Sequence, residues 1–283
     1  MVRGIVAEAG RNVGKPGFTP NPASWNPSAI TAAWLGHSTV LINFFGVNIL
    51  TDPVLCKRIG ADTLMGNLGP KRLVAPALNA LHLPRIDLVL LSHAHMDHLD
   101  PATLRALPGK PQVVTAHATL DLLEGLGLGS RKALRWDQSA RVATSQGDLE
   151  IKAFEVKHWG ARWKVDQYRG YNGYVVSREG RKIIFGGDTA MTSSFRNLRK
   201  DGPYELAIMP IGAYQPWINS HCTPEQAVQM TEDAGAKHVL PVHFKTFPFG
   251  REGTLEPLQR LEAAMEASRI GWRDVGQTFT TAA

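Results

Sequence analysis

Cysteine is scarce in this sequence, and long apolar runs are missing from it. The only two cysteines among 283 residues, Cys56 and Cys222, provide neither a disulfide framework nor a Cys-x-x-Cys metal pair. A reducing compartment is therefore expected. The densest apolar run, 86–91, has the length of a strand and is too short to cross a membrane. The first residues, Met-Val-Arg-Gly-Ile-Val-Ala-Glu, contain no apolar segment of the length that a secretory signal needs.

These absences together predict a cytoplasmic protein. Peripheral contact with a membrane stays compatible with the sequence, because it needs only an apolar or basic surface patch. The formal net charge of +6 modestly favours phosphate-bearing or other anionic partners. Lysine and arginine are spread along the chain, without a basic stripe or an aromatic stacking platform, so no nucleic-acid partner is expected.

The chain divides by composition into a short arm and one larger domain. Gly, Pro, Asn and Ser are concentrated between 10 and 30, a composition that disfavours helices and strand pairing, and we predict an extended N-terminal arm over 1–31. Beyond it, strand-like and helical patterns alternate without a linker, which predicts a single α/β (α+β) domain over 32–283. Strands are expected at 39–45, 47–50, 86–91, 113–115, 151–156, 173–177, 181–185, 206–210 and 239–242.

Two helices have clear sequence signals. The run Thr-Pro-Glu-Gln at 223–226 has the form of a capping box with proline at the first helical position. Its buried stripe is expected to be Ala227, Met230 and Ala234. A second amphipathic helix that covers a sheet is expected near the C-terminus. Its apolar positions are Leu255, Leu258, Leu261 and Met265.

Three histidines and an aspartate are crowded into six residues directly after the apolar run 86–91: His93, His95, Asp97 and His98. An alternative without metal is that Asp97 or Asp100 only caps a helix that starts at the following proline. Protonated imidazoles at this spacing would repel one another, whereas a divalent cation makes the crowding favourable. The cluster therefore predicts a metal site.

Asp97 and His98, which come after the turn, can face a second ion. One short loop cannot enclose two ions, so further ligands must come from distant segments. His158, Asp188 and His243 each follow a predicted strand, and the ends of such strands can converge on one edge of layered sheets. Taken singly, each has an ordinary alternative: a surface histidine, a turn aspartate and a core imidazole. Their joint occurrence with the His93 cluster favours the metal site.

The run His93-Ala-His95-Met-Asp97-His98 resembles the His-x-His-x-Asp-His signature of the metallo-β-lactamase superfamily. Blocks on either side resemble those of hydrolases similar to N-acylphosphatidylethanolamine-hydrolysing phospholipase D, and the resemblance extends over residues 34–246. Among these blocks are Trp-Leu-Gly-His at 34–37, Leu-Thr-Asp-Pro at 50–53, Gly-Asp-Thr at 187–189 and His-Cys-Thr-Pro-Glu-Gln-Ala at 221–227. This resemblance implies a four-layer αββα sandwich as a single domain.

The resemblance also implies a ligand set for two divalent metal ions. Zn²⁺ is the expected metal, with Mn²⁺ or Fe as alternatives. The first ion would be bound by His93, His95 and His158, the second by Asp97, His98 and His243, and Asp188 would bridge them. Asp52 would sit behind the ligands and accept a hydrogen bond from a ligand histidine, although an aspartate before Pro53 can equally belong to a turn. His37 is interpreted as a residue that contacts a ligand rather than a metal ion, or as a structural residue.

A binuclear site of this kind suits phosphodiester hydrolysis. Two ions can share a hydroxide for attack on phosphorus and offset charge on the phosphoryl oxygens, with Asp97 expected to orient the nucleophile. By the resemblance, His221 lies near the substrate, where it contacts a phosphate or protonates a leaving group. Alternatively, His221 only supports the start of the following helix.

The expected substrate is a small-molecule or lipid phosphodiester. Aromatic residues, including Trp159 and Tyr214, gather in sequence around the later ligands and predict an apolar mouth that would contact substrate together with His221, although any one of them can be ordinary core packing. Three rival functions are considered: a lactonase or other carboxylic ester hydrolase, an RNA-processing nuclease, and a non-catalytic metal-binding module.

Overall fold

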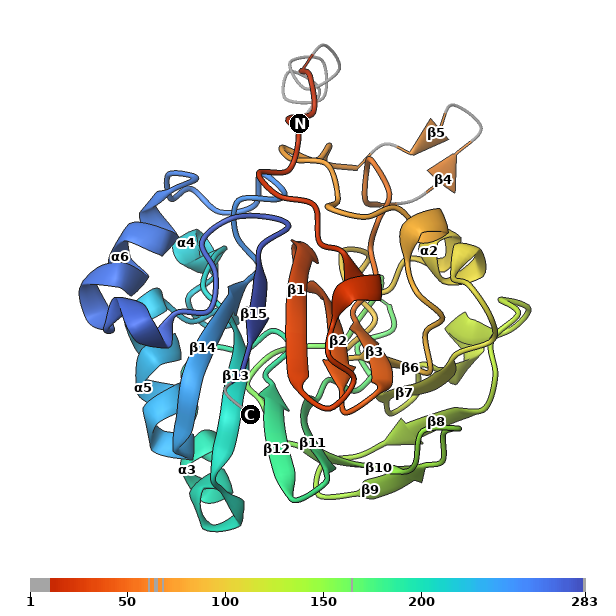
Figure 1. Ribbon diagram of the computed structural model, residues 1–283. Coiled ribbons are helices and arrows are strands. Elements are labelled where there is room, and N and C mark those ends of the chain that lie inside the picture. Colours follow the sequence, from red (N-terminus) through yellow and green to blue (C-terminus); the bar gives the residue numbers. More distant parts are fainter. Residues whose placement is uncertain (1–10, 61, 64–65, 68, 164, 282–283) are drawn as a thin grey trace.

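Two mixed β-sheets form the centre of the protein in a computed structural model that describes residues 11–60, 62–63, 66–67, 69–163 and 165–281 (Figure 1). The first sheet has the order β15-β1-β2-β3-β6-β7-β8 and the second has the order β14-β13-β12-β11-β10-β9. The strands of the first sheet are β1 (Ile30–Gly36), β2 (Thr39–Phe44), β3 (Val47–Thr51), β6 (Leu88–Leu91), β7 (Gln112–Ala116), β8 (Arg131–Leu134) and β15 (Thr278–Thr280). Those of the second are β9 (Ser139–Val142), β10 (Leu149–Phe154), β11 (Gly173–Arg178), β12 (Arg181–Phe185), β13 (Tyr204–Pro210) and β14 (Ala236–Val242). A separate two-stranded sheet pairs β4 (Asp62–Thr63) antiparallel with β5 (Gly66–Asn67).

Helices lie outside the two sheets, with α5 and α6 on the β13–β14 side and α2 on the opposite side of the molecule (Figure 1). The α-helices are α2 (Pro101–Ala106), α3 (Ser194–Leu198), α4 (Tyr214–Trp217), α5 (Pro224–Ala234) and α6 (Glu256–Ala264). Short 3-10 turns occur at η1 (Pro22–Ser24), η2 (Ala80–His82), η3 (Leu120–Leu123), η4 (Arg199–Asp201) and η5 (Ala267–Arg269). The arrangement is the predicted αββα sandwich, in a single domain.

The core lies between layers, so its central strands are apolar on both faces. Every residue of β1, β2, β6 and β13 is buried, because a strand with one face on the other sheet and one face on helices has no solvated side. Trp34 of β1 stacks on Phe244 with ring centroids 4.7 Å apart. This pairing packs the first sheet against the segment that follows β14.

Several strands of the two sheets run parallel to a neighbour. β3 pairs in parallel with β6, and β12 with β13 and β13 with β14. Parallel strands bring their carboxyl ends to the same edge of a sheet. The loops after β12 and β14 therefore leave the same edge of the second sheet. The histidines and aspartate that follow β6 in the first sheet lie beside them.

All nine predicted strands are present, with ends shifted by up to three residues. The prediction missed β1 and the short strands β4 and β5, and it also missed β8, β9 and β15. Polar edge strands such as β9, whose side chains alternate between exposed and buried, lack an apolar run. β1 begins at Ile30, inside the range predicted for the arm. Residues 1–10 of that arm lie outside the described residues, and Gly14 pairs with Val74 in an isolated parallel bridge.

Both predicted helices form, but the second differs in detail. The capping box of α5 is present, with Thr223 and Gln226 each bonding the other's backbone N–H, and Gly235 ends the helix in the left-handed region. α6 packs against α5, and Leu261 and Met265 are buried as expected. Leu255 is wrong as a core position: it precedes the first turn and is 51% exposed.

Candidate metal centre

The site is built from loops that leave four strands of both sheets. His93, His95, Asp97 and His98 lie between β6 and α2, and Asp100 caps α2 by accepting from Ala102 and Thr103. His158 follows β10, Asp188 follows β12 and His243 follows β14. All seven residues predicted as ligands come together at one place, and none of them is left elsewhere.

A first group consists of three imidazoles. His93 Nε2 lies 2.7 Å from His95 Nδ1, and His158 Nε2 lies 3.3 Å from the same nitrogen. Three nitrogens that converge so closely need a shared cation or proton between them. The group His93, His95 and His158 is therefore able to hold one metal ion.

A second group combines carboxylates and imidazoles beside the first. His98 Nε2 and His243 Nε2 each lie 3.1 Å from Asp188 Oδ2, and they lie 3.4 and 3.5 Å from Asp97 Oδ2. The same Asp188 oxygen is 3.8 Å from His158 Nε2. Asp188 thus reaches both groups, which is the position a bridging carboxylate would need.

His37 belongs to the second group as closely as the ligands do. Its Nε2 lies 3.0 Å from Asp97 Oδ2, and its ring centroid is 4.2 Å from that of His243. His37, Asp97, His98 and His243 together form a cluster that could hold an ion. The backbone of His37 has a φ of 54°. The His37 N–H donates to Thr246 Oγ1 at 2.7 Å, and this bond fixes the loop between β1 and β2.

Outer partners orient several of the imidazoles. His98 Nδ1 is 2.6 Å from Asp52 Oδ2, and Asp52 also accepts from Ser92 N and Ser92 Oγ at 2.7 and 2.6 Å. Ser92 Oγ lies 2.8 Å from His93 Nδ1, and His158 Nδ1 donates to the Ser220 carbonyl at 2.8 Å. Such partners hold the ring with its other nitrogen toward the metal position.

Sequence reasoning missed Ser92 and Ser220 in these roles. Ser92 stands directly before His93. Its closeness to His93 was therefore evident from the sequence, but its role as a hydrogen-bond partner of that ring was not. The Ser220 contact uses a backbone carbonyl, for which a side-chain motif carries no signal.

The protonation states suit metal binding. Burial lowers the pKa of His93 well below its ordinary value, that of His95 to about 4 and that of His158 to about 3, so these rings are neutral, the form that ligates metals. Burial opposes ionisation of Asp188, but His243 and His98 hold its pKa well below the usual range. The first group thus offers neutral imidazoles. In the second group, despite burial, Asp188 raises the pKa of His98 well above its ordinary value and that of His243 to about 9, so metal binding there would release protons from these two rings.

Several buried donor atoms of this cluster have no hydrogen-bond partner within the protein. Among the described residues, His98 Nε2, Asp188 Oδ1 and His243 Nε2 are buried without a hydrogen-bond partner. Buried polar atoms without partners are costly, and nitrogen and carboxylate donors gathered at one point are the ligands that divalent transition metals prefer. The residues present therefore fit a metal centre.

A cavity of about 270 Å³ opens beside the cluster. Trp159, Trp217 and Phe249 line it together with Asp97, Asp188 and His243. Trp159 is 48% and Trp217 49% exposed. Part of the predicted apolar mouth is therefore present, formed by three aromatic rings from three segments that lie far apart in the sequence.

His221 and Tyr214, both predicted to contact substrate, lie differently. His221 lines the cavity, with Nδ1 3.9 Å from Asp188 Oδ2, and burial lowers its pKa to about 4. Tyr214 is buried, donates its hydroxyl to Glu256 at 2.8 Å and is absent from the residues that line the cavity. The structure brings His221 to the site and turns Tyr214 away from it.

The comparisons with known proteins agree with this geometry. A family described as "Beta-lactamase superfamily domain" matches residues 47–244. An uncharacterized protein of Mycobacterium tuberculosis is 33% identical over 269 residues, covering 90% of this chain and 69% of that protein. N-acyl-phosphatidylethanolamine-hydrolyzing phospholipase D 1 of Caenorhabditis elegans is 32% identical over 255 residues, covering 85% of this chain and 71% of that protein.

Solved structures show the same fold. Igni18, a metallo hydrolase from the archaeon Ignicoccus hospitalis, has a TM-score of 0.67 at 23% identity and covers 90% of this chain and 99% of that chain. Within the described residues, no helix is both long and apolar enough to cross a membrane. The matches and the converging His/Asp cluster together show that this chain belongs to the metallo-β-lactamase superfamily of metal-dependent hydrolases, with relatives named for hydrolysis of N-acylphosphatidylethanolamine.

Proposed function

We propose that the protein is a binuclear phosphodiesterase of the N-acylphosphatidylethanolamine phospholipase D type. The observation that carries this proposal is Asp188, whose Oδ2 lies 3.1 Å from His98 and His243 and 3.8 Å from His158. A carboxylate shared by two donor groups suits a pair of ions better than one. Two divalent cations, with Zn²⁺ proposed as the metal, would supply an activated water and charge neutralisation for displacement at phosphorus.

The proposed ligands follow the two groups. His93, His95 and His158 would hold the first ion, Asp97, His98 and His243 the second, and Asp188 would contact both. Asp52 and His37 would orient these ligands, because Asp52 lies 2.6 Å from His98 Nδ1 and His37 lies 3.0 Å from Asp97.

Two residues are proposed to act on the reacting groups. Asp97 holds its carboxylate ionised beside the cavity: burial opposes this, but His98, His243 and His37 keep its pKa well below the usual range. It would orient the attacking water. His221 is neutral, since burial lowers its pKa to about 4, and an N–H of its ring would donate a hydrogen bond to a phosphoryl or leaving-group oxygen.

The cavity supports a substrate with an apolar portion. Trp159, Trp217 and Phe249 offer aromatic surface directly beside Asp97 and Asp188, and aromatic walls bind apolar groups through burial and dispersion. A small-molecule or lipid phosphodiester would therefore place its phosphate on the cluster and its chain along these rings. A cytoplasmic location with peripheral membrane contact is part of the same proposal.

The test combines metal analysis with a substrate panel. Purified protein should contain two metal ions per chain and hydrolyse bis-p-nitrophenyl phosphate faster than a simple lactone. Asp97→Ala and Asp188→Ala should abolish turnover, while Asp233→Asn, which alters a surface pair with Arg196, should not. Near-normal rates in either alanine variant would reject the site assignment, a faster lactone reaction would favour a lactonase, and bound metal with no turnover would favour a binding module.

A further inference from the structure

A single segment, 213–221, carries three features that face the candidate centre. Trp217 and His221 line the cavity, and the Ser220 carbonyl accepts the hydrogen bond from His158 Nδ1 at 2.8 Å. Within the segment, the Trp217 carbonyl accepts from Ser220 N and His221 N at 2.8 and 2.9 Å. The position of Trp217 is thus coupled to that of His221 and to an outer contact of a proposed ligand.

The beginning of this segment has little regular structure of its own. Ala213 adopts a left-handed conformation with a φ of 63°, and Gln215 interrupts α4 with a φ of −107° and a ψ of 115°. A non-glycine residue in the left-handed region, such as Ala213, persists where surrounding contacts hold it, and the extended backbone of Gln215 leaves α4 without a continuous helical turn. The segment therefore depends on an external anchor.

Glu252 supplies that anchor. Its carboxylate accepts from Ala213 N through Oε1, and from Gln215 N through Oε2 at 3.3 Å. Arg251 N donates to the Gln215 carbonyl at 2.8 Å. An ionised carboxylate that accepts two backbone N–H groups makes charge-assisted hydrogen bonds, which are stronger than neutral ones.

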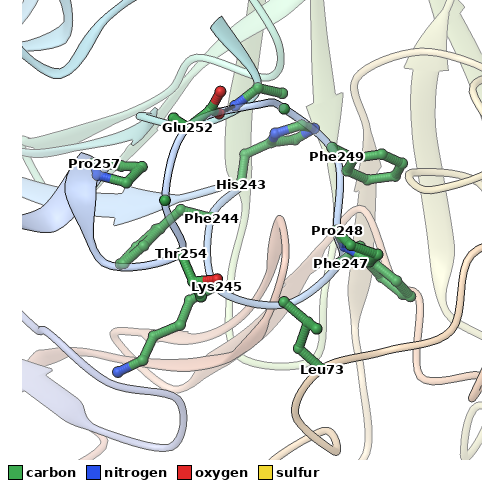
Figure 2. A pocket seen from close by; sticks show the side chains of 14 residues that line it. Leu73, His243, Phe244, Lys245, Phe247, Pro248, Phe249, Glu252, Thr254 and Pro257 are labelled. Carbon is green, nitrogen blue, oxygen red and sulfur yellow. Dashed lines mark hydrogen bonds between the residues drawn. The ribbon is translucent and has the colours of Figure 1, made fainter. Parts of the chain in front are cut away.

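Glu252 stands beside the site without lining its cavity. It borders a second cavity of about 150 Å³ that shares Ala213, His243 and Phe249 with the first. Figure 2 shows Glu252 and His243 at the same end of this second cavity. The carboxylate thus lies on the far side of Ala213 and His243 from the first cavity. From there it can hold Ala213 in position without touching substrate.

We propose that Glu252 is a positioning residue, which holds the 213–221 segment so that Trp217 and His221 face the metal cluster. The kinetic test of this inference rests on the proposed function. The structural test does not. Glu252→Gln is the informative change, because it keeps the side-chain volume and replaces one acceptor oxygen by an NH₂ group that faces a backbone donor. The matched control is Glu262→Gln, which alters an exposed pair with Arg273.

The structural experiment is hydrogen exchange on the full-length protein. Losing one charge-assisted bond should speed exchange of the amides in 213–221 on the order of tenfold in Glu252→Gln, with the metal content and the thermal midpoint close to wild type. Glu262→Gln should leave that segment unchanged. Unaltered exchange of these amides in Glu252→Gln would overturn the proposal.

The kinetic experiment is a double-mutant cycle with Trp217→Ala on a long-chain phosphodiester. Glu252→Gln should lower kcat/KM on the order of tenfold. The double variant should lose little more than Trp217→Ala alone, because both changes act through the position of the Trp217 ring. Fully additive losses would overturn the positioning role. Faster exchange in a protein that turns over no phosphodiester would reject the proposed function and leave the positioning role supported.

Discussion

His98 and Asp52 meet at the back of the candidate centre, with Nδ1 of the ring 2.6 Å from Oδ2 of the carboxylate and both side chains fully buried. Burial alone would lower the pKa of His98, but Asp188, Asp97 and Asp52 raise it well above its ordinary value. The ring is thus fixed with its Nε2 toward Asp188 and Asp97. A carboxylate–histidine pair of this kind orients a ligand and raises its basicity.

Asp52→Asn should weaken this orientation while preserving shape. Loss of an outer partner typically costs about 10- to 100-fold in metal affinity or activity, and we expect that loss in metal titrations of the variant. Asp148→Asn, which alters an exposed pair with Arg141, is the control. Metal affinity equal to wild type in Asp52→Asn would mean that Asp52 serves only the turn before Pro53.

Metal removal should destabilise the folded protein. Chelation leaves buried, unpartnered atoms at His98, His243 and Asp188, and it removes a ligand that binds only the native state. At a free metal concentration of about one hundred times Kd, bound metal stabilises the fold by about 2.7 kcal/mol. Thermal melts with and without chelator should differ by several degrees and recover when metal is restored. Superimposable melts would contradict a bound metal.

The aromatic rings at the mouth should govern preference for chain length. Trp159→Ala and Trp217→Ala each remove a half-exposed ring from the cavity. We expect kcat/KM to fall by roughly 10-fold for long-chain phosphodiesters, the order of a lost aromatic contact, and to change little for short-chain ones. Trp136→Ala, an exposed tryptophan that borders a different cavity, is the control. Equal losses on short and long chains would argue against an apolar subsite.

The charge of the cavity should select diesters over monoesters. Of the described residues that line the cavity, none is a lysine or an arginine, so a dianionic monoester finds no side-chain cation beyond the metal site to offset its second charge. Bis-p-nitrophenyl phosphate should be hydrolysed at least about tenfold faster than p-nitrophenyl phosphate, which corresponds to about 1.4 kcal/mol. A preference for the monoester would count against the proposed substrate class.

A surface pair should make stability depend on pH in a defined window. Hydrogen bonding to Arg260 lowers the pKa of Glu225 from 4.5 to about 2, with both Glu225 oxygens 2.8 Å from the guanidinium. The pair is partly exposed, so Glu225→Gln should cost only about 0.5 kcal/mol in urea unfolding at pH 7. Because the folded pKa is depressed, this contribution is complete above pH 4.5 and declines toward pH 2. An undiminished difference near pH 2 would contradict the assignment.

The sequence by itself determined the chemistry of the site. His93, His95, Asp97 and His98 lie within six residues after a strand, so local spacing and the resemblance were enough to predict which side chains gather there. The apolar runs were enough to predict most of the central strands, but β1, whose residues are all buried, was missed. The polar edge strand β9 escaped prediction, because edge strands are stabilised by pairing rather than by an apolar run.

The tertiary structure alone decided how those donors are oriented and which residues surround them. Asp52 is 46 residues from His98, and Ser220 is 62 residues from His158, so these contacts exist only once distant strands pair. Tyr214 shows the same limit: it carries an aromatic ring at the expected place in the chain, but the bond to Glu256 draws it away from the cavity. Residue type sets which interactions are available, while side-chain direction depends on packing between elements that local sequence does not encode.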